Sequence, residues 1–203
     1  MGKKKDKARV SGGSDTRKVI LDAVLELAAS YPWQSVSYGQ IAEKARMTIQ
    51  DVEDCFASKQ DMVKAIVSDM DGRVLDSYQV DASSSKRDLL FDVLMERFDA
   101  MTEHRAAHLS FLKSYGWTYS SKRRDLNLYF CSLSRYVSVS GIETRGLFGP
   151  MNVAAIGLGY FYVLTVWSQD SSSDLTRTMA ALDKTLSRLD WLKEYISRPV
   201  RAA

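Results

Sequence analysis

Apolar residues recur along most of the chain at the three- and four-residue spacing of helices. The first such stripe begins after Asp15 or Thr16 and includes Ile20 and Val24. It predicts a helix that ends just before Pro32, because the residue preceding a proline leaves the α region. This helix would present one apolar face to the rest of its domain.

Later stripes predict further helices, which are separated by polar or glycine-rich turns. The sequence contains only three prolines, so few positions interrupt helical structure. It therefore predicts an all-α fold. The expected helices lie near 62–78, 89–101, 104–119, 126–137, 150–167 and 175–189.

The most informative stretch runs from Ser37 to Lys59. Three times within it, Ser or Thr is followed three residues later by Gln or Asp, the spacing of a helix N-cap and its reciprocal partner. Two short helices, a tight turn and the start of a third helix are predicted. The capping pairs are Ser37 with Gln40, Thr48 with Asp51, and Ser58 with Asp61.

This stretch resembles the helix-turn-helix of the TetR family of transcriptional regulators. The matching positions are Ile41, Ala42, Ala45, Met47, Thr48, Val52, Phe56, Ser58 and Lys59. The resemblance implies a TetR-like fold and a ligand-responsive DNA-binding regulator, usually a repressor, that acts as a homodimer in the cytoplasm. It implies a helix-turn-helix head over residues 14–60 and a ligand-binding and dimerisation domain over residues 61–198.

The sequence departs from the family pattern at the turn and in the second, DNA-reading helix. Arg46 occupies the position of the turn glycine, and Gln50 that of a second glycine. Glu53 and Asp54 replace residues that contact phosphate in the family. Residues 48–56 thus carry three acids and no base, which opposes binding to negatively charged DNA.

By resemblance, the start of the first reading helix and the exposed side of the second are expected to contact double-stranded DNA. Gln50 would pair with adenine in the major groove, and Glu53 and Asp54 would accept hydrogen bonds from cytosine amino groups. Lys59 would bind a phosphate. The expected contact residues are Ser37, Tyr38, Thr48, Ile49, Gln50, Glu53, Asp54 and Lys59.

Basic residues concentrate at the N-terminus. Five bases against one acid give residues 1–13 a charge of +4, which leaves −1 of the net charge of +3 for the remainder. A short charged segment of this kind is expected to be disordered. It would either follow the DNA backbone or remain a solvated tail.

Aromatic and apolar residues on the central helices form either an effector pocket or plain core. As a pocket, they would bind a small apolar or aromatic effector, with tyrosine hydroxyls as polar contacts. As core, they would fill the interior of the domain, which is the commoner use of such a stripe. The residues concerned are Phe98, Met101, Phe111, Tyr115, Tyr129, Phe130 and Phe161.

The last two helices carry more apolar surface than one subunit needs. Spacings of four and three residues alternate from Leu175 to Leu186, a 3.5-residue period typical of helix bundles. Two copies would form a four-helix bundle, as in TetR-family dimers; alternatively, both stripes face the subunit's own core. The expected interface residues are Ile156, Tyr160, Val163, Trp167, Leu175, Met179, Leu182 and Leu186.

The segment from Trp167 to Leu189 also resembles a TetR-like family that assists coenzyme Q biosynthesis and binds isoprenoid lipid. The shared string consists of Gln169, Asp170, Ser171, Ser172 and Asp174. This second resemblance implies an alternative function, that of a lipid-binding accessory protein that does not bind DNA.

Signals for catalysis, metals and membranes are weak. His104 and His108 have the i, i+4 spacing of zinc ligands but lack a third ligand nearby, so they are expected at the surface or at a pocket rim. No phosphate loop or Ser-His-Asp pattern indicates an enzyme or a cofactor. Cys55 and Cys131 are expected to stay reduced in a cytoplasm. No apolar run of about 18 residues predicts a membrane span.

Overall fold

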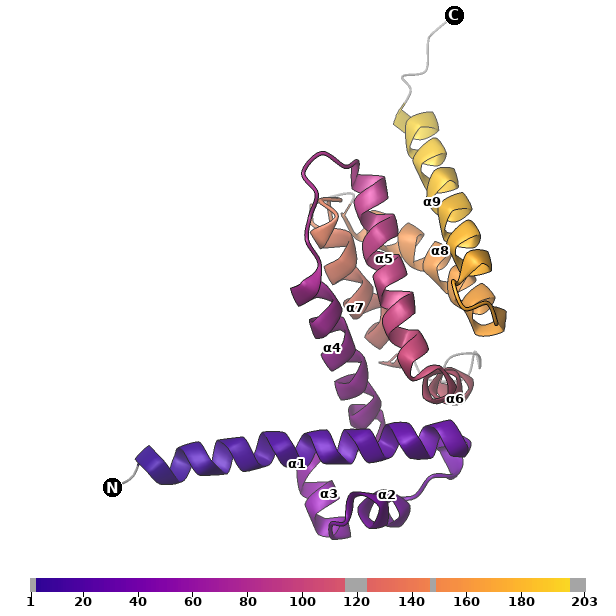
Figure 1. The fold of residues 1–203 in the computed structure, drawn as a ribbon. Coiled ribbons are helices and arrows are strands. Elements are labelled where there is room, and N and C mark those ends of the chain that lie inside the picture. The colour runs from indigo at the N-terminus through magenta and orange to yellow at the C-terminus, as the bar shows by residue number, and fades with distance from the viewer. Residues whose placement is uncertain (1–2, 116–123, 147–148, 198–203) are drawn as a thin grey trace, which may run out of the picture. The chain divides into compact units, whose positions relative to one another are not determined.

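The computed structural model describes residues 3–115, 124–146 and 149–197 (Figure 1). All regular elements in these ranges are helices, and the predicted all-α class is confirmed. In chain order they are α1 (Lys3–Ser30), the 3₁₀ turn η1 (Trp33–Ser35), α2 (Tyr38–Ala45), α3 (Ile49–Cys55), α4 (Lys59–Ser77), α5 (Lys86–Glu103), α6 (Arg105–Tyr115), α7 (Arg124–Val139), α8 (Gly149–Gln169) and α9 (Thr176–Ser197).

The chain divides into two compact units. The N-terminal unit comprises Met1–Met70 and Met101–Asp125, and the C-terminal unit comprises Asp71–Ala100 and Leu126–Ala203. The predicted domain boundary at residue 60 stays a prediction, since units defined by packing need not follow functional boundaries. The division places α6 in the same unit as α2 and α3, an association that the sequence did not indicate.

Helix α1 begins at Lys3, which corrects both the start predicted at Asp15 or Thr16 and the disordered tail predicted over residues 1–13. Lysine, alanine and arginine make up much of this segment and are favourable helix residues. No proline interrupts the segment, so the helix runs on through the glycine pair at positions 12 and 13.

An apolar core fills the N-terminal unit. Ile20 and Val24 of α1, which the stripe predicted to face inward, are fully buried. Ile41 of α2 and Val52 of α3 are equally buried, and Phe111 of α6 belongs to the same cluster. The apolar faces of α2 and α3 therefore fix how these two short helices pack on α1.

Trp33 lies at the centre of the N-terminal unit. Its side chain is buried, and its backbone N–H donates to Ser110 Oγ of α6 over 2.9 Å. The Trp33 ring meets the edge of Phe111 with 5.3 Å between centroids, a T-shaped arrangement that aromatic rings favour. Ser110 in turn donates to the carbonyl oxygen of Tyr31 over 3.2 Å. Helix α6 therefore holds the segment that connects α1 to α2.

The C-terminal unit contains α8 and α9 side by side (Figure 1). The two helices approach closely at Gly159, where a Cβ atom would lie 2.5 Å from Cγ2 of Thr185. A larger side chain at this position would push α9 away.

Seven of the eight residues expected at a dimer interface are buried inside the C-terminal unit instead. Their exposed fractions are 4% or less, so they fill the core of a single subunit. Of the predicted set only Met179 is exposed, at 43%. The 3.5-residue period correctly indicated that these residues are buried, but it could not show which surface they pack against. The seven residues are Ile156, Tyr160, Val163, Trp167, Leu175, Leu182 and Leu186.

The predicted effector pocket is also corrected. Phe98 and Met101 are buried but belong to different compact units, and Phe111 packs against Trp33. Phe98 stacks on Tyr160 with 5.2 Å between centroids. These side chains fill cores rather than line one cavity. Phe161 is half-buried, and the side chains of Tyr115, Tyr129 and Phe130 lie outside the described residues.

One carboxylate, that of Asp170, holds the turn between α8 and α9. Asp170 is 1% exposed. Its Oδ2 accepts the N–H and the hydroxyl of Thr178, each over 2.8 Å, and its Oδ1 accepts the N–H of Ser172 over 3.1 Å. Burial acts to raise the pKa of Asp170, but these hydrogen bonds outweigh it and hold the pKa well below its usual range. In this fold, Asp170 and Ser172 of the string shared with the lipid-binding family therefore build a turn.

We expect Asp170→Asn to lower the free energy of unfolding by about 2–4 kcal/mol at pH 7, because buried donors lose a charged acceptor. The folded-state pKa lies below the unfolded value of about 3.9, so this stabilisation is complete above that pH and is lost as the pH falls below it. The difference in the free energy of unfolding between the variant and the wild type should therefore become smaller below about pH 4. Urea unfolding followed by circular dichroism at several pH values measures it.

The matched control is Asp174→Asn, which changes an exposed carboxylate of the same turn. Because this carboxylate is exposed, the variant should lose much less unfolding free energy than Asp170→Asn. A loss at Asp170 no larger than the loss at Asp174 would contradict the role assigned to the buried carboxylate.

Candidate nucleic-acid interface

The helix-turn-helix predicted from the capping pairs is formed by α2 and α3. Ser37 Oγ accepts the N–H of Gln40 over 3.3 Å, and Gln40 Oε1 accepts the N–H of Ser37 over 2.8 Å. Thr48 and Asp51 repeat this arrangement at the start of α3, over 3.2 and 2.9 Å. The predicted caps are therefore confirmed, and they fix the residue at which each helix begins.

Arg46 forms the turn between α2 and α3 in a left-handed conformation, with φ of 56° and ψ of 45°. Its N–H donates to the carbonyl oxygens of Ala42 and Glu43, so it ends α2 as a glycine usually does. The conformation costs a residue with a Cβ atom about 1 kcal/mol. Met47 follows and packs, half-buried, against the core of the N-terminal unit.

Helix α3 buries Val52 and exposes the side expected to read DNA. Ile49 is 49% exposed, and Gln50, Glu53 and Asp54 are exposed with it. Gln50 Nε2 donates to Asp54 Oδ1 over 2.8 Å, one helical turn away. A base contact by Gln50 would therefore compete with Asp54, a constraint that the sequence does not reveal.

Ser37 and Tyr38 open α2. Ser37 is exposed, whereas Tyr38 is half-buried against the core of the N-terminal unit. Burial raises the pKa of the Tyr38 hydroxyl, and the charges of Glu53 and Asp61 raise it further. The hydroxyl therefore stays protonated at neutral pH and can donate to an anionic oxygen such as that of a phosphate.

Lys59 does not fill the role predicted for it. Its ammonium donates to the carbonyl oxygens of Trp33, of Val36 over 2.6 Å and of Gln34 over 3.4 Å. It also lies over the Trp33 ring, 4.3 Å from the centroid. Burial lowers the pKa of Lys59. All three donors of the ammonium are engaged, so Lys59 ties α4 to η1 and is not free to bind a phosphate.

Two further bases of the N-terminal unit are engaged within it. Arg17 Nη1 donates to the carbonyl oxygen of Cys55 over 2.7 Å, and its guanidinium lies 4.2 Å from the centroid of the Phe56 ring. A cation at the C-terminus of a helix favours the helix dipole, so Arg17 stabilises α3. Lys44 forms an ion pair with Glu26. These contacts reduce the positive charge that is available to DNA.

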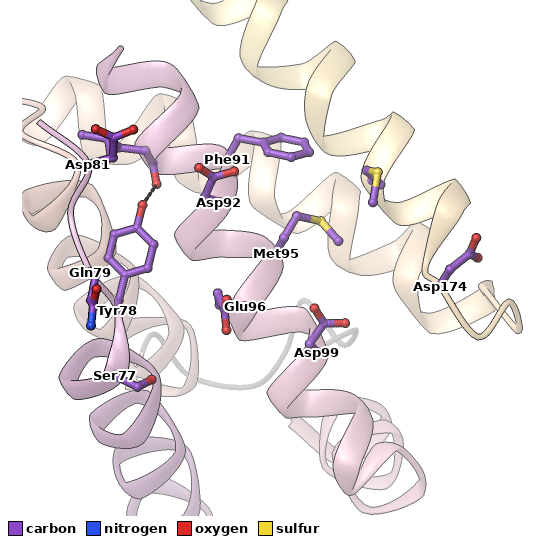
Figure 2. Close-up of a pocket in the computed structure, with 12 residues that line it drawn as sticks. Ser77, Tyr78, Gln79, Asp81, Phe91, Asp92, Met95, Glu96, Asp99 and Asp174 are labelled. Atoms are coloured by element: carbon purple, nitrogen blue, oxygen red, sulfur yellow. Dashed lines mark hydrogen bonds between the residues drawn. The ribbon is translucent and has the colours of Figure 1, made fainter. Parts of the chain in front are cut away.

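A cleft of about 710 Å³ lies in the C-terminal unit beside α5, the end of α4 and the start of α9 (Figure 2). Phe91 and Met95 supply apolar surface, and the Tyr78 hydroxyl donates to the carbonyl oxygen of Leu89 over 3.1 Å. Burial raises the pKa of Asp99. Because the charged side chains that line the cleft are carboxylates, the cleft favours cations over anions. The carboxylates of the cleft are Asp81, Asp92, Glu96, Asp99 and Asp174.

A buried polar network crosses the C-terminal unit. Asp71 of α4 and Arg97 of α5 are each 1% exposed, and Arg97 Nε lies 3.1 Å from Asp71 Oδ1. Tyr136 of α7 donates its hydroxyl to the same Oδ1 over 2.7 Å, and Ser132 donates to Oδ2. Burial raises the pKa of Tyr136. The network joins three helices through one carboxylate.

This network was not predicted from the sequence, although the sequence contains a signal for it. Arg97 lies four residues after Val93 and four residues before Met101, inside an apolar stripe. A charged residue on the buried face of a helix needs a partner, because an isolated buried charge is very unfavourable. That partner is Asp71, which lies on the apolar face of α4 in the same way.

The two histidines differ in burial. His104 is exposed at the junction between α5 and α6, whereas His108 is 3% exposed and meets the Phe111 ring edge-on. The expectation of a surface or pocket-rim position is therefore wrong for His108. Among the described residues, no group of three or more His, Cys, Asp or Glu side chains is placed to hold a metal ion.

Helix α8 is long and apolar enough to cross a membrane, by length and composition alone. No such segment was predicted from the sequence. One helix of this kind is weak evidence of a span, because a helix in the core of a folded domain meets the same criteria.

No family model and no curated protein matches this sequence. A TetR transcriptional regulator from Nitrosomonas europaea ATCC 19718 matches the structure with a TM-score of 0.71 at 17% identity, over 86% of this chain and 98% of that one. A TetR regulator from Rhodococcus sp. RHA1 gives 0.63 at 17% identity, over 87% and 97%. The chain has the TetR fold.

A third solved structure, a TetR-family regulator from Streptomyces coelicolor, gives a TM-score of 0.58 at 14% identity, over 90% of this chain and 83% of that one. These matches confirm the TetR-like fold expected from the helix-turn-helix resemblance. At this level of identity they establish architecture, and function has to be argued from the site itself.

We expect Lys59→Met to lower the free energy of unfolding by about 2–3 kcal/mol, because the carbonyl groups of Trp33 and Val36 lose their donor. Lys59→Arg keeps the charge and part of the hydrogen bonding, so it should lower the free energy of unfolding by less than Lys59→Met does. Denaturant unfolding followed by circular dichroism measures both variants. If Lys59 served only to bind phosphate, Lys59→Met would leave the stability unchanged.

Proposed function

We propose that this protein is a DNA-binding transcriptional regulator that acts as a homodimer, most simply as a repressor in the cytoplasm. The observation that carries the proposal is the capped pair α2 and α3, with the outer side of α3 exposed, on a TetR fold. In a helix-turn-helix, the first helix crosses the DNA backbone and the second enters the major groove with its N-terminal residues on base edges. Helix α3 has the position of the second helix.

In this proposal Ser37 and Tyr38 contact the DNA backbone, and Ile49 and Gln50 face the bases together with the cap of α3. Gln50 pairs with adenine after it releases Asp54, so part of the binding free energy is spent on breaking their hydrogen bond. The released carboxylate then accepts from a cytosine amino group or repels a phosphate. This competition makes affinity depend on the base opposite α3.

The proposed dimer interface is the exposed apolar face of α8. Met151, Leu158 and Tyr162 are 57%, 71% and 56% exposed in the single subunit. Their spacings of seven and four residues place them on one side of the helix. An exposed apolar surface of this kind marks an interaction site, and the same face of a second copy would cover it with twofold symmetry.

We extend the proposal to a small-molecule effector that binds the C-terminal unit. Asp71 bonds α4 to Arg97 of α5 and to Tyr136 of α7, so a ligand that repacks α5 or α7 would shift α4. Helix α4 contributes residues to both compact units. The effector must favour one separation of the two heads over another, because equal affinity for both shifts nothing.

The experiment that tests DNA binding is capture of fragmented genomic DNA by the purified protein at about 0.1 M salt, followed by sequencing. We expect enrichment of a palindromic site, because a symmetric dimer reads two half-sites. Gln50→Ala removes an exposed side chain of α3 and leaves the core intact, so it should stay folded and lose the enrichment.

No enriched site, with a folded wild-type dimer, would refute DNA binding. The alternative of a lipid-binding accessory protein would then be favoured, and mass spectrometry of the native protein would test it through a retained lipid. Equal enrichment by wild type and Gln50→Ala would leave DNA binding standing but remove Gln50 from the reading residues.

We expect Leu158→Glu to convert the dimer into a folded monomer, because it buries an unpaired charge at a closed apolar interface. Sedimentation measures the mass, and circular dichroism checks the fold. Val80→Glu, which changes a 54% exposed apolar side chain outside α8, should remain dimeric. A Leu158→Glu protein that stays dimeric would place the interface elsewhere.

A further inference from the structure

Arg46 differs from its basic neighbours in having both a strained backbone and an uncommitted side chain. Its φ of 56° lies in the region that favours glycine. Its side chain is exposed, and among the described residues no acceptor lies within hydrogen-bonding or ion-pairing distance of its guanidinium. Glu43, the preceding acid one turn earlier, is also exposed and does not pair with it. Backbone conformations of this kind are concentrated at functional sites.

Most other bases near the helix-turn-helix are engaged. Between residues 15 and 64, Arg17, Lys44, Lys59 and Lys64 each bind carbonyl oxygens or carboxylates. Lys18 is exposed without such a partner, but it belongs to α1 and lies outside the helix-turn-helix. Within the two reading helices and their turn, the uncommitted positive charge is therefore concentrated at one position.

That position is where a helix-turn-helix meets both the backbone and the groove of DNA. Arg46 ends α2 and comes two residues before Thr48, the N-cap of α3. The first helix of the motif crosses the phosphates, and the N-terminus of the second enters the major groove. A long cationic side chain between them can reach the phosphates at the rim of the groove. A guanidinium can bind such a phosphate with two parallel hydrogen bonds.

We propose that Arg46 binds a DNA phosphate and supplies the positive charge that α3 lacks. The inference rests on the proposed DNA binding and adds a residue that no resemblance assigns. Helix α3 and its cap carry three acids and no base, so a phosphate contact beside them has to come from a neighbouring element. The unfavourable backbone at Arg46 is then retained because a glycine would remove the charge.

The test is the salt dependence of binding to a fluorescein-labelled duplex of mixed sequence, measured by anisotropy between about 50 and 200 mM KCl. A phosphate contact does not depend on sequence, so no operator is needed. Arg46→Gly should bind about tenfold more weakly near 0.1 M salt. The slope of log K against log salt should fall by about 0.9 per subunit. Arg46→Lys keeps the charge and should retain most of the slope.

The matched control is Lys18→Gln, which removes one exposed positive charge from α1 and should leave the slope nearly unchanged. Arg46→Gly should also raise Tm by about 2–4 °C, because glycine adopts the left-handed conformation without strain. A variant that is more stable and yet binds DNA more weakly is not expected from a structural role alone.

The possible outcomes distinguish a failure of this inference from a failure of the proposed function. If the wild type binds the duplex and Arg46→Gly binds it with the same affinity and slope, the assignment to Arg46 is wrong while DNA binding stands. Equal losses in Arg46→Gly and Lys18→Gln would also overturn it, since a general charge effect would then explain both. If the wild type does not bind DNA at all, the proposed function fails and this inference fails with it.

Discussion

The N-terminal unit depends on the burial of Trp33 beneath the ammonium of Lys59. The turn η1 leaves backbone carbonyl groups without helical partners, and Lys59 donates to those of Trp33 and Val36. A cation at the N-terminus of α4 opposes the helix dipole, but the carbonyl oxygens and the indole ring compensate for it. The backbone of the same tryptophan donates to Ser110 of α6. Because Ser37 directly follows Val36 and caps α2, the start of the helix-turn-helix is fixed by this cluster.

The same cluster explains why the face that is proposed to contact DNA carries little positive charge. Lysine and arginine that hold the unit together cannot also neutralise phosphates, and Lys59 and Arg17 are both engaged internally. The acids of α3 also differ in whether they are engaged within the unit. Asp51 is a capping residue whose pKa is lowered by the hydrogen bonds from Thr48, and a negative charge is favourable at a helix N-terminus. Glu53 remains exposed and opposes phosphate binding. Of these two acids, only Asp51 helps to fix the geometry of α3.

Local features could be predicted from the sequence, and tertiary ones could not. The caps at Ser37 and Thr48 depend on residues three positions away, so their spacing was sufficient to predict them. Lys59 matched a family position, but its role depends on carbonyl groups more than twenty residues away, which no local pattern reveals. Within the candidate interface, periodicity therefore predicted the helices and their exposed side. It did not predict the internal hydrogen bond of Gln50 or the engaged bases, because these depend on the packing of side chains around the motif.

Helix α8 shows why an apolar period alone could not locate the dimer interface. Its buried stripe packs inside the subunit, and α8 approaches α9 closely at Gly159. Apolar residues continue around the helix, and Leu158 and Tyr162 are left exposed. Helix α8 is apolar around most of its circumference, which is why its composition meets the criteria for a membrane span. The same composition suits a helix that packs against its own subunit on one side and against a second copy on the other. The carboxylate of Asp170 fixes the turn into α9, so the buried stripe of α8 is held inside the subunit, and Leu158 and Tyr162 lie on the face that stays exposed.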